Sequence, residues 1–123
     1  MEGGHRLAIS AGSGQVLFDG KVGDPVLLGG LDIQSAGTVG FAQPVRTGAG
    51  AGVSINNSDA LVIASGANFT LDGSFIQSGS GAVQLGANVT TTGDAVTLAA
   101  PTTLSGNVAL RTNGGAVTLQ GVA

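Results

Sequence analysis

The apolar residues of this chain stand in short runs, in which they alternate with polar or small residues. Examples are LAIS at 7–10, LDIQ at 31–34, AVQL at 82–85 and AVTL at 95–98. A period of two residues is typical of β-strands, because successive side chains of a strand point to opposite faces. Clusters of Gly, Ser, Asn and Asp separate the runs and predict tight turns. No segment keeps the spacing of an amphipathic helix over three turns, so the pattern predicts an all-β chain.

The runs also repeat at longer intervals. AVTL at 95–98 returns at 116–119, and LGANV at 85–89 returns as LSGNV at 104–108. These offsets of about 19 to 21 residues are typical of a coil repeat, in which each coil resembles the coil before it.

The first half of the chain follows a looser version of the repeat. Leu7 and Ile9 recur as Leu31 and Ile33, about 24 residues later. The same interval, to within a residue, relates a second set of positions: Val16, Phe18 and Val22 to Val39, Phe41 and Val45. An insertion of a few residues at a turn near 23–25 would explain the longer interval.

About three short strands in each repeat predict a parallel β-helix of about five to six coils, each about 19 to 24 residues long. In this β-solenoid every coil packs its inward side chains on those of the neighbouring coils. The competing all-β interpretation is an antiparallel sandwich or barrel, whose hairpins do not give a period of three strands with stacked side chains. The expected inward core includes Val83, Val96, Leu98, Val108 and Val117.

Three asparagines stand just before an inward apolar residue of successive repeats. Asn68 and Asn88 occupy the same place in ANFTLDGSFIQ and ANVTTTGDAVT, and Asn107 occupies it in LSGNV. Stacked coils would bring the three amides to one corner, where each could form a hydrogen bond with the next. The spacing therefore predicts a corner ladder.

Longer stretches of the chain resemble the glycine-rich β-strand repeats of filamentous-haemagglutinin-like proteins, which are very large secreted bacterial surface proteins. The stretches are GSGQVLFDGKVGD, LDIQSAGTVGFAQPVRTG, QLGANVTTTGDAVTLAAPTTLSG and GGAVTLQG. The resemblance covers nearly the whole chain from Leu7 onward. It implies a right-handed parallel β-helix that is exported across the outer membrane and acts as a rod in adhesion or matrix building. The family brings no catalytic residues with it.

Composition narrows the partners. The chain has 123 residues, of which 23 are Gly and none is Cys, and its charged content is 9% with a net charge of −3. Scattered charges without a basic stripe predict no nucleic-acid partner. No apolar run reaches the roughly 18 residues that span a bilayer, so we expect no membrane span. The absence of Cys excludes disulfides and thiolate metal sites.

Residues with catalytic chemistry are few. His5 is the only histidine, so a Ser-His-Asp triad or a histidine metal site has a single residue to start from. Asp72 and Asp94 each end a strand in a Gly-containing turn, and we interpret both as turn carboxylates that accept backbone hydrogen bonds. No calcium-binding GGxGxD repeat is present. We therefore predict no enzyme activity and no catalytic, cofactor-binding or metal-binding residue.

Threonine clusters at 90–92 and 102–103 raise the alternative of a flat ice-binding or carbohydrate-binding face. The series is broken, because Leu71 and Asp72 stand where the next repeat has threonines. Exposed strand threonines are the interpretation that we favour.

These observations predict a structural protein. Residues 1–6 are expected to be a flexible or added amino-terminal segment, and residues 7–123 a repeat segment of a longer protein. We expect a rigid shaft or spacer of a secreted adhesin or surface filament, located outside the cell or on a bacterial cell surface, with no cofactor. Expected partners are further copies, stacked through the open solenoid ends, and a host or matrix glycan or protein receptor. The alternative is a carbohydrate-binding or carbohydrate-cleaving β-helix domain.

Overall fold

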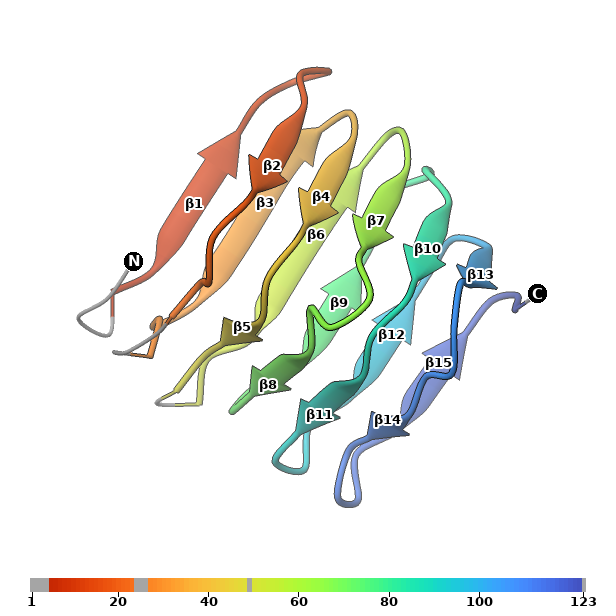
Figure 1. The fold of residues 1–123 in the computed structure, drawn as a ribbon. Coiled ribbons are helices and arrows are strands. Elements are labelled where there is room, and N and C mark those ends of the chain that lie inside the picture. Colours follow the sequence, from red (N-terminus) through yellow and green to blue (C-terminus); the bar gives the residue numbers. More distant parts are fainter. Residues whose placement is uncertain (1–4, 24–26, 49, 123) are drawn as a thin grey trace.

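Fifteen short strands and no helix make up the described part of the chain, which covers residues 5–23, 27–48 and 50–122 of a computed structural model. The strands form a β-solenoid of about five turns, with the two ends of the chain at opposite ends of the stack (Figure 1). The predictions of an all-β chain and of a parallel β-helix are confirmed.

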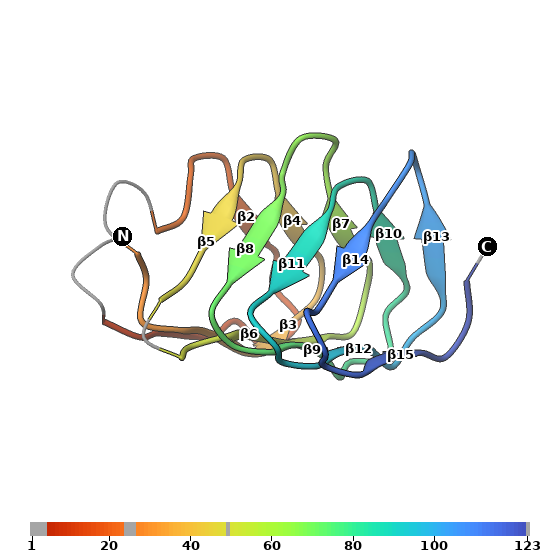
Figure 2. The same cartoon turned by 90° about the horizontal axis from the view of Figure 1, so that it is seen from below.

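Each turn contributes strands to three parallel sheets, seen along their edges in Figure 2. Sheet A contains β1 (Leu7–Ser10), β3 (Leu31–Ala36), β6 (Val53–Asn57), β9 (Phe75–Gln77), β12 (Val96–Leu98) and β15 (Val117–Leu119). Sheet B contains β2 (Val16–Phe18), β4 (Val39–Phe41), β7 (Leu61–Ile63), β10 (Val83–Leu85) and β13 (Thr102–Leu104). Sheet C contains β5 (Val45–Arg46), β8 (Phe69–Leu71), β11 (Val89–Thr91) and β14 (Leu110–Arg111).

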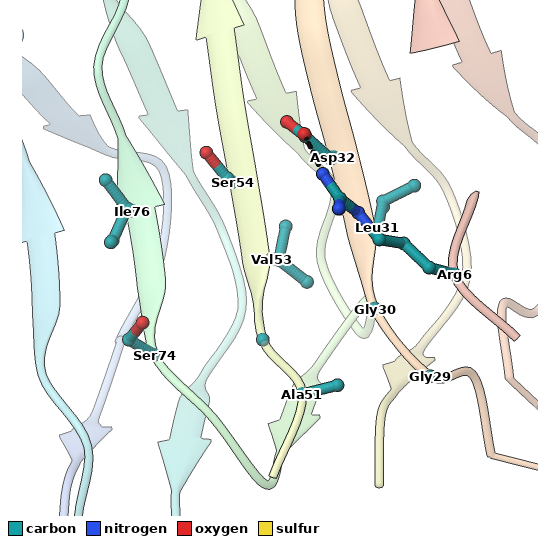
Figure 3. A pocket seen from close by; sticks show the side chains of 11 residues that line it. Arg6, Gly29, Gly30, Leu31, Asp32, Ala51, Val53, Ser54, Ser74 and Ile76 are labelled. Atoms are coloured by element: carbon teal, nitrogen blue, oxygen red, sulfur yellow. Dashed lines mark hydrogen bonds and ion pairs between the residues drawn. The ribbon is translucent and has the colours of Figure 1, made fainter. Parts of the chain in front are cut away.

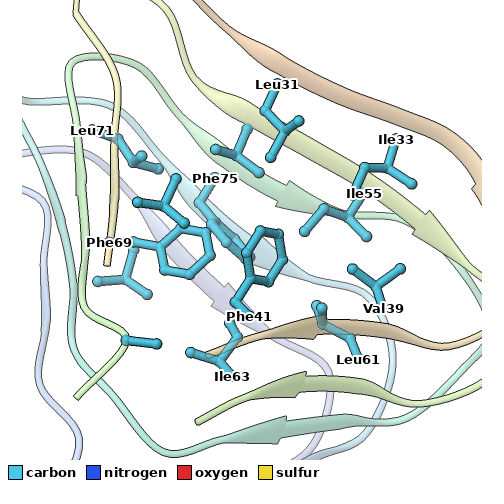
Figure 4. Close-up of a cluster of buried hydrophobic side chains, with 14 of the residues drawn as sticks. Leu31, Ile33, Val39, Phe41, Ile55, Leu61, Ile63, Phe69, Leu71 and Phe75 are labelled. Atoms are coloured by element: carbon cyan, nitrogen blue, oxygen red, sulfur yellow. The ribbon is translucent and has the colours of Figure 1, made fainter. Parts of the chain in front are cut away.

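Aliphatic side chains and four phenylalanines fill the interior between the three sheets (Figure 4). Phe18 stacks on Phe41 with ring centroids 4.9 Å apart, which is the stacking of like on like that adjacent coils require. Phe69 then contacts Phe41 and Phe75 edge to face, at centroid distances of 5.0 and 5.2 Å. These contacts join all three sheets, because the rings come from strands of each.

The register follows the repeats of the first half residue by residue. Leu7 pairs with Leu31, Val16 with Val39 and Phe18 with Phe41, and Val22 forms an isolated bridge with Val45. The two AVTL copies are also in register, since Val96 pairs with Val117. Most of the insertion predicted near 23–25 lies outside the described residues.

The predicted alignment of LGANV with LSGNV is correct only at its start. Leu85 pairs with Leu104, an offset of 19 residues, but Val89 pairs with Leu110, an offset of 21. Two extra residues therefore enter the corner between β13 and β14. They move Asn107 and Val108 out of the positions predicted for them.

The predicted core residues divide by their distance from the carboxyl-terminal end. Val83, Val96 and Leu98 are buried, and Val108 is half-buried and packs against the core. Val117 is 44% exposed, so the prediction that it is buried is wrong. It pairs in register with the buried Val96, but β15 is the last strand of sheet A, and no described strand covers its far side.

Glycine permits the close approach of two coils at the corner between sheets A and B. A Cβ on Gly79 would lie 1.9 Å from the carbonyl oxygen of Asn57, and a Cβ on Gly81 would lie 1.8 Å from that of Asp59. Any side chain there would push the coils apart. The SGSG sequence at 78–81 is thus a packing requirement of this corner.

Candidate functional site

Ionisable side chains are dispersed over the solenoid. The described residues contain no group of three or more His, Cys, Asp or Glu side chains that could hold a metal ion. His5 is exposed, and only its backbone carbonyl is engaged, as the acceptor for the N–H of Gly29. The geometry among the described residues therefore offers no triad and no cluster of metal ligands.

The largest hollow in the surface, of about 310 Å³, lies on the outer face of sheet A (Figure 3). Arg6 and Asp32 form an ion pair on one side of it. Ser54, Ser74 and the exposed Ile76 come from the β6 and β9 side. The floor is glycine-rich backbone, which keeps the hollow shallow.

This hollow combines charged, hydroxyl and apolar groups, which are the groups that contact the hydroxyls and the apolar face of a sugar ring. Asp32 is its only carboxylate. Glycoside hydrolysis ordinarily needs two carboxyl groups on either side of the scissile bond. The arrangement suits binding of a small polar ligand and lacks the pair of acids for its cleavage.

Asp72 joins three successive coils at the corner between sheets C and A. Its carboxylate accepts hydrogen bonds from the backbone N–H of Gly50 at 2.7 Å and from the hydroxyl of Thr92 at 2.7 Å. These two bonds, that from Gly50 first, lower the pKa of Asp72 below its usual 3.8. The Asp94 carboxylate accepts no hydrogen bond from the described residues, so the turn interpretation describes Asp72 but not Asp94.

The asparagine ladder exists, but its bonds are not those predicted. Asn68 Oδ1 accepts the backbone N–H of Asn88 at 3.0 Å, and Asn88 Oδ1 accepts the backbone N–H of Ala109 at 2.8 Å. The side chains therefore bind the main chain of the next coil instead of each other's amides. The prediction for Asn107 is wrong, because the two extra residues in its corner put Ala109 opposite Asn88.

A second ladder, inside the solenoid, was not predicted from the sequence. Asn57 and Gln77 are fully buried in sheet A, and Gln77 Nε2 donates to Asn57 Oδ1 at 2.9 Å and to Gly79 O at 2.9 Å. Gln77 Oε1 accepts the backbone N–H groups of Ala99 and Ala100, both at 3.0 Å. One amide side chain thus links three coils.

The signal for this inner ladder is a polar residue in an apolar column. Gln77 pairs with Ile55 on one side and with Leu98 on the other, so the repeat predicts an aliphatic residue at its position. Asn57 completes the network by donating to the carbonyl of Asp59 at 2.6 Å. Every buried side-chain nitrogen and oxygen in the described part of the chain has a hydrogen-bond partner.

Buried threonines close the turns that lead into sheet A. The hydroxyls of Thr47, Thr91 and Thr112 donate to the carbonyls of Ala51, Asp94 and Gly115, at 2.5 to 2.6 Å. The expectation of exposed threonines is therefore wrong for Thr91, and also for Thr102, which is 2% exposed. Thr92 and Thr103 are exposed as expected.

The carboxyl-terminal end of the solenoid is open and apolar. Its large exposed side chains are Leu104, Val117, Leu119 and Val122. They border a hollow of about 150 Å³ that reaches the core beside Leu85 and Leu98. This end is the largest concentration of exposed bulky apolar side chains in the described structure.

Comparisons with known proteins give no relative: no family model, curated protein or solved structure matches this chain. The described residues contain no helix that is long and apolar enough to cross a membrane. The fold defines the chain as a β-solenoid repeat protein.

Proposed function

We propose that this chain is a rigid, non-enzymatic shaft or spacer of a secreted adhesin or surface-filament protein, outside the cell or on a bacterial surface. The observation that carries the proposal is the continuity of the stacking from end to end. Three parallel sheets run the length of the solenoid, and their hydrogen bonds point along its axis. Load along the axis is therefore shared by many parallel bonds.

The internal polar groups support the same role. The ladders of Asn68 and Asn88, of Asn57 and Gln77, and of Asp72 each link successive coils by side-chain bonds. Such bonds resist sliding of one coil over another and leave no buried group unpaired in the described chain. The resemblance of the glycine-rich repeats to those of filamentous-haemagglutinin-like proteins favours export and adhesion.

Native-state proteolysis tests the shaft. Cleavage by thermolysin requires local opening of the chain, and stacked coils open rarely. We expect no early cleavage between β3 and β12. Rapid cleavage inside these strands, under conditions where circular dichroism shows β-structure, would contradict a rigid shaft.

Carbohydrate binding is the second candidate, favoured by the hollow beside Arg6 and Asp32. A glycan array followed by calorimetry tests it, with Asp32→Asn and Ser54→Ala as hollow variants and Thr103→Ala, on another face, as the control. Binding that both hollow variants weaken and the control retains would favour this function. Glycan cleavage by the unmodified chain would contradict the non-enzymatic role.

A further inference from the structure

Exposed bulky apolar side chains are concentrated at one end of the solenoid. The inward residues of the first turn, by contrast, are half-buried and pack against the core: Leu7, Ile9, Val16 and Phe18. The last turn instead exposes Leu104, Val117, Leu119 and Val122, at 41%, 44%, 37% and 50%. The surface that remains to be covered is therefore the carboxyl-terminal end.

The outer edge of β15 is open to another strand. On its inner edge, Val96 donates its N–H to Ala116 O at 2.9 Å and Gln120 donates its N–H to Leu98 O at 3.2 Å. Backbone groups of successive residues point to opposite sides of a strand, so those of Val117 and Leu119 point to the open edge. This edge has no charge, proline or bulge of the kind that prevents strand addition.

We propose that this end docks against the same end of a second copy of the chain, so that two β15 strands pair antiparallel about a two-fold axis at Thr118. The inference rests on the proposed function as a rod. In this register Val117 faces Leu119 of the second copy, and their open N–H and C=O groups exchange hydrogen bonds. The same two side chains point inward, so the pairing also covers them.

Shape and charge agree with a contact between like ends. Val122 begins a further layer on sheet B, whereas sheet C ends at β14, so the end is a helical ramp. A two-fold axis perpendicular to the solenoid turns such a ramp into itself, which keeps one strand spacing all round. The only charged residue between 95 and 122 is Arg111, on the outer face of sheet C, so no charge is buried. A like-to-like contact closes after two copies.

A single introduced thiol tests the register. The chain has no cysteine, and Thr118 lies exposed at the centre of the proposed pairing. Residues facing each other at a non-hydrogen-bonded position have Cα atoms about 4.5 Å apart, within the range that a disulfide spans. We expect mild oxidation of Thr118→Cys to convert most of the protein to a linked dimer.

Thr97→Cys is the matched control, one coil back on the outer face of sheet A. Its two thiols would be separated by three strand spacings, about 14 Å, so oxidation leaves this variant unlinked. In sedimentation velocity, the unmodified chain should reach a dimer and grow no further. Leu119→Lys should weaken the dimer at least tenfold.

Three outcomes would overturn the proposal: a monomer at all concentrations, growth beyond the dimer, or equal linking of both cysteine variants. None of these concerns the stability of the coils themselves. Circular dichroism and thermolysin resistance of Leu119→Lys are measured in parallel, so a failed dimer is distinguished from a failed shaft.

Discussion

Gln77 Nε2 donates a hydrogen bond to Asn57 Oδ1 across 2.9 Å, inside a column whose other members are aliphatic. Both side chains are inaccessible to solvent. A buried polar pair is costly if one partner is lost, because the remaining groups keep their desolvation penalty. This pair therefore fixes the register of neighbouring coils more strictly than aliphatic contacts would.

Replacement of Gln77 by leucine should destabilise the chain although leucine suits the column. The backbone N–H of Ala100 would lose its acceptor, Gln77 Oε1, and Asn57 would lose a donor. We expect a loss of about 1–3 kcal/mol in the free energy of unfolding, measured by urea denaturation. Gln84→Leu, on the exposed side of β10, should change it by less than about 0.5 kcal/mol. Equal effects of the two variants would contradict the role of the inner ladder.

The corner ladder should distinguish Asn88 from Asn107. Asn88→Ala removes the acceptor of the Ala109 N–H and should cost about 0.5–1.5 kcal/mol. Asn107→Ala removes no hydrogen bond printed between the coils, because the residue lies out of register. Thermal unfolding of both variants checks this, and a larger loss for Asn107→Ala would restore the alignment that the structure corrects.

Asp72 should make stability depend on pH in the acid range. Hydrogen bonds from Gly50 and Thr92 lower its pKa in the folded chain below 3.8, the usual value, so the stabilisation is present above that pH. It is lost as pH falls through the lowered pKa. Urea midpoints between pH 5 and pH 2 should therefore fall less steeply for Asp72→Asn than for the unmodified chain. Asp94→Asn, which removes the same charge, is the control, and an unchanged slope in Asp72→Asn would refute the linkage.

Pattern and repeats predicted the strands and most of the register because inward and outward positions alternate strictly. Leu7 with Leu31 and Val96 with Val117 were identified from letters alone. The corner before β14 was not, since a turn absorbs two residues without changing the polarity pattern on either side. Asn107 was misplaced for that reason.

Burial and polar pairing depended on neighbours that a repeat does not specify. Val96 and Val117 have the same letters around them, yet one is covered on both sides and the other on one side only. Gln77 looked like an exposed strand residue, because nothing in SFIQS says which face holds the amide. An alignment of the sheet A strands would have shown it in an aliphatic column.

Hydrogen exchange of the backbone amides tests the central claim, a continuous stack of coils, most directly. Protection follows the number of packed neighbours, so amides of the inner strands β6 to β12 should exchange slowest, and those of β13 to β15 should exchange faster. The expected result is a graded profile along the axis, with Phe69 and Val83 among the slowest. Fast and uniform exchange across the inner strands would contradict the stacked solenoid and, with it, the shaft.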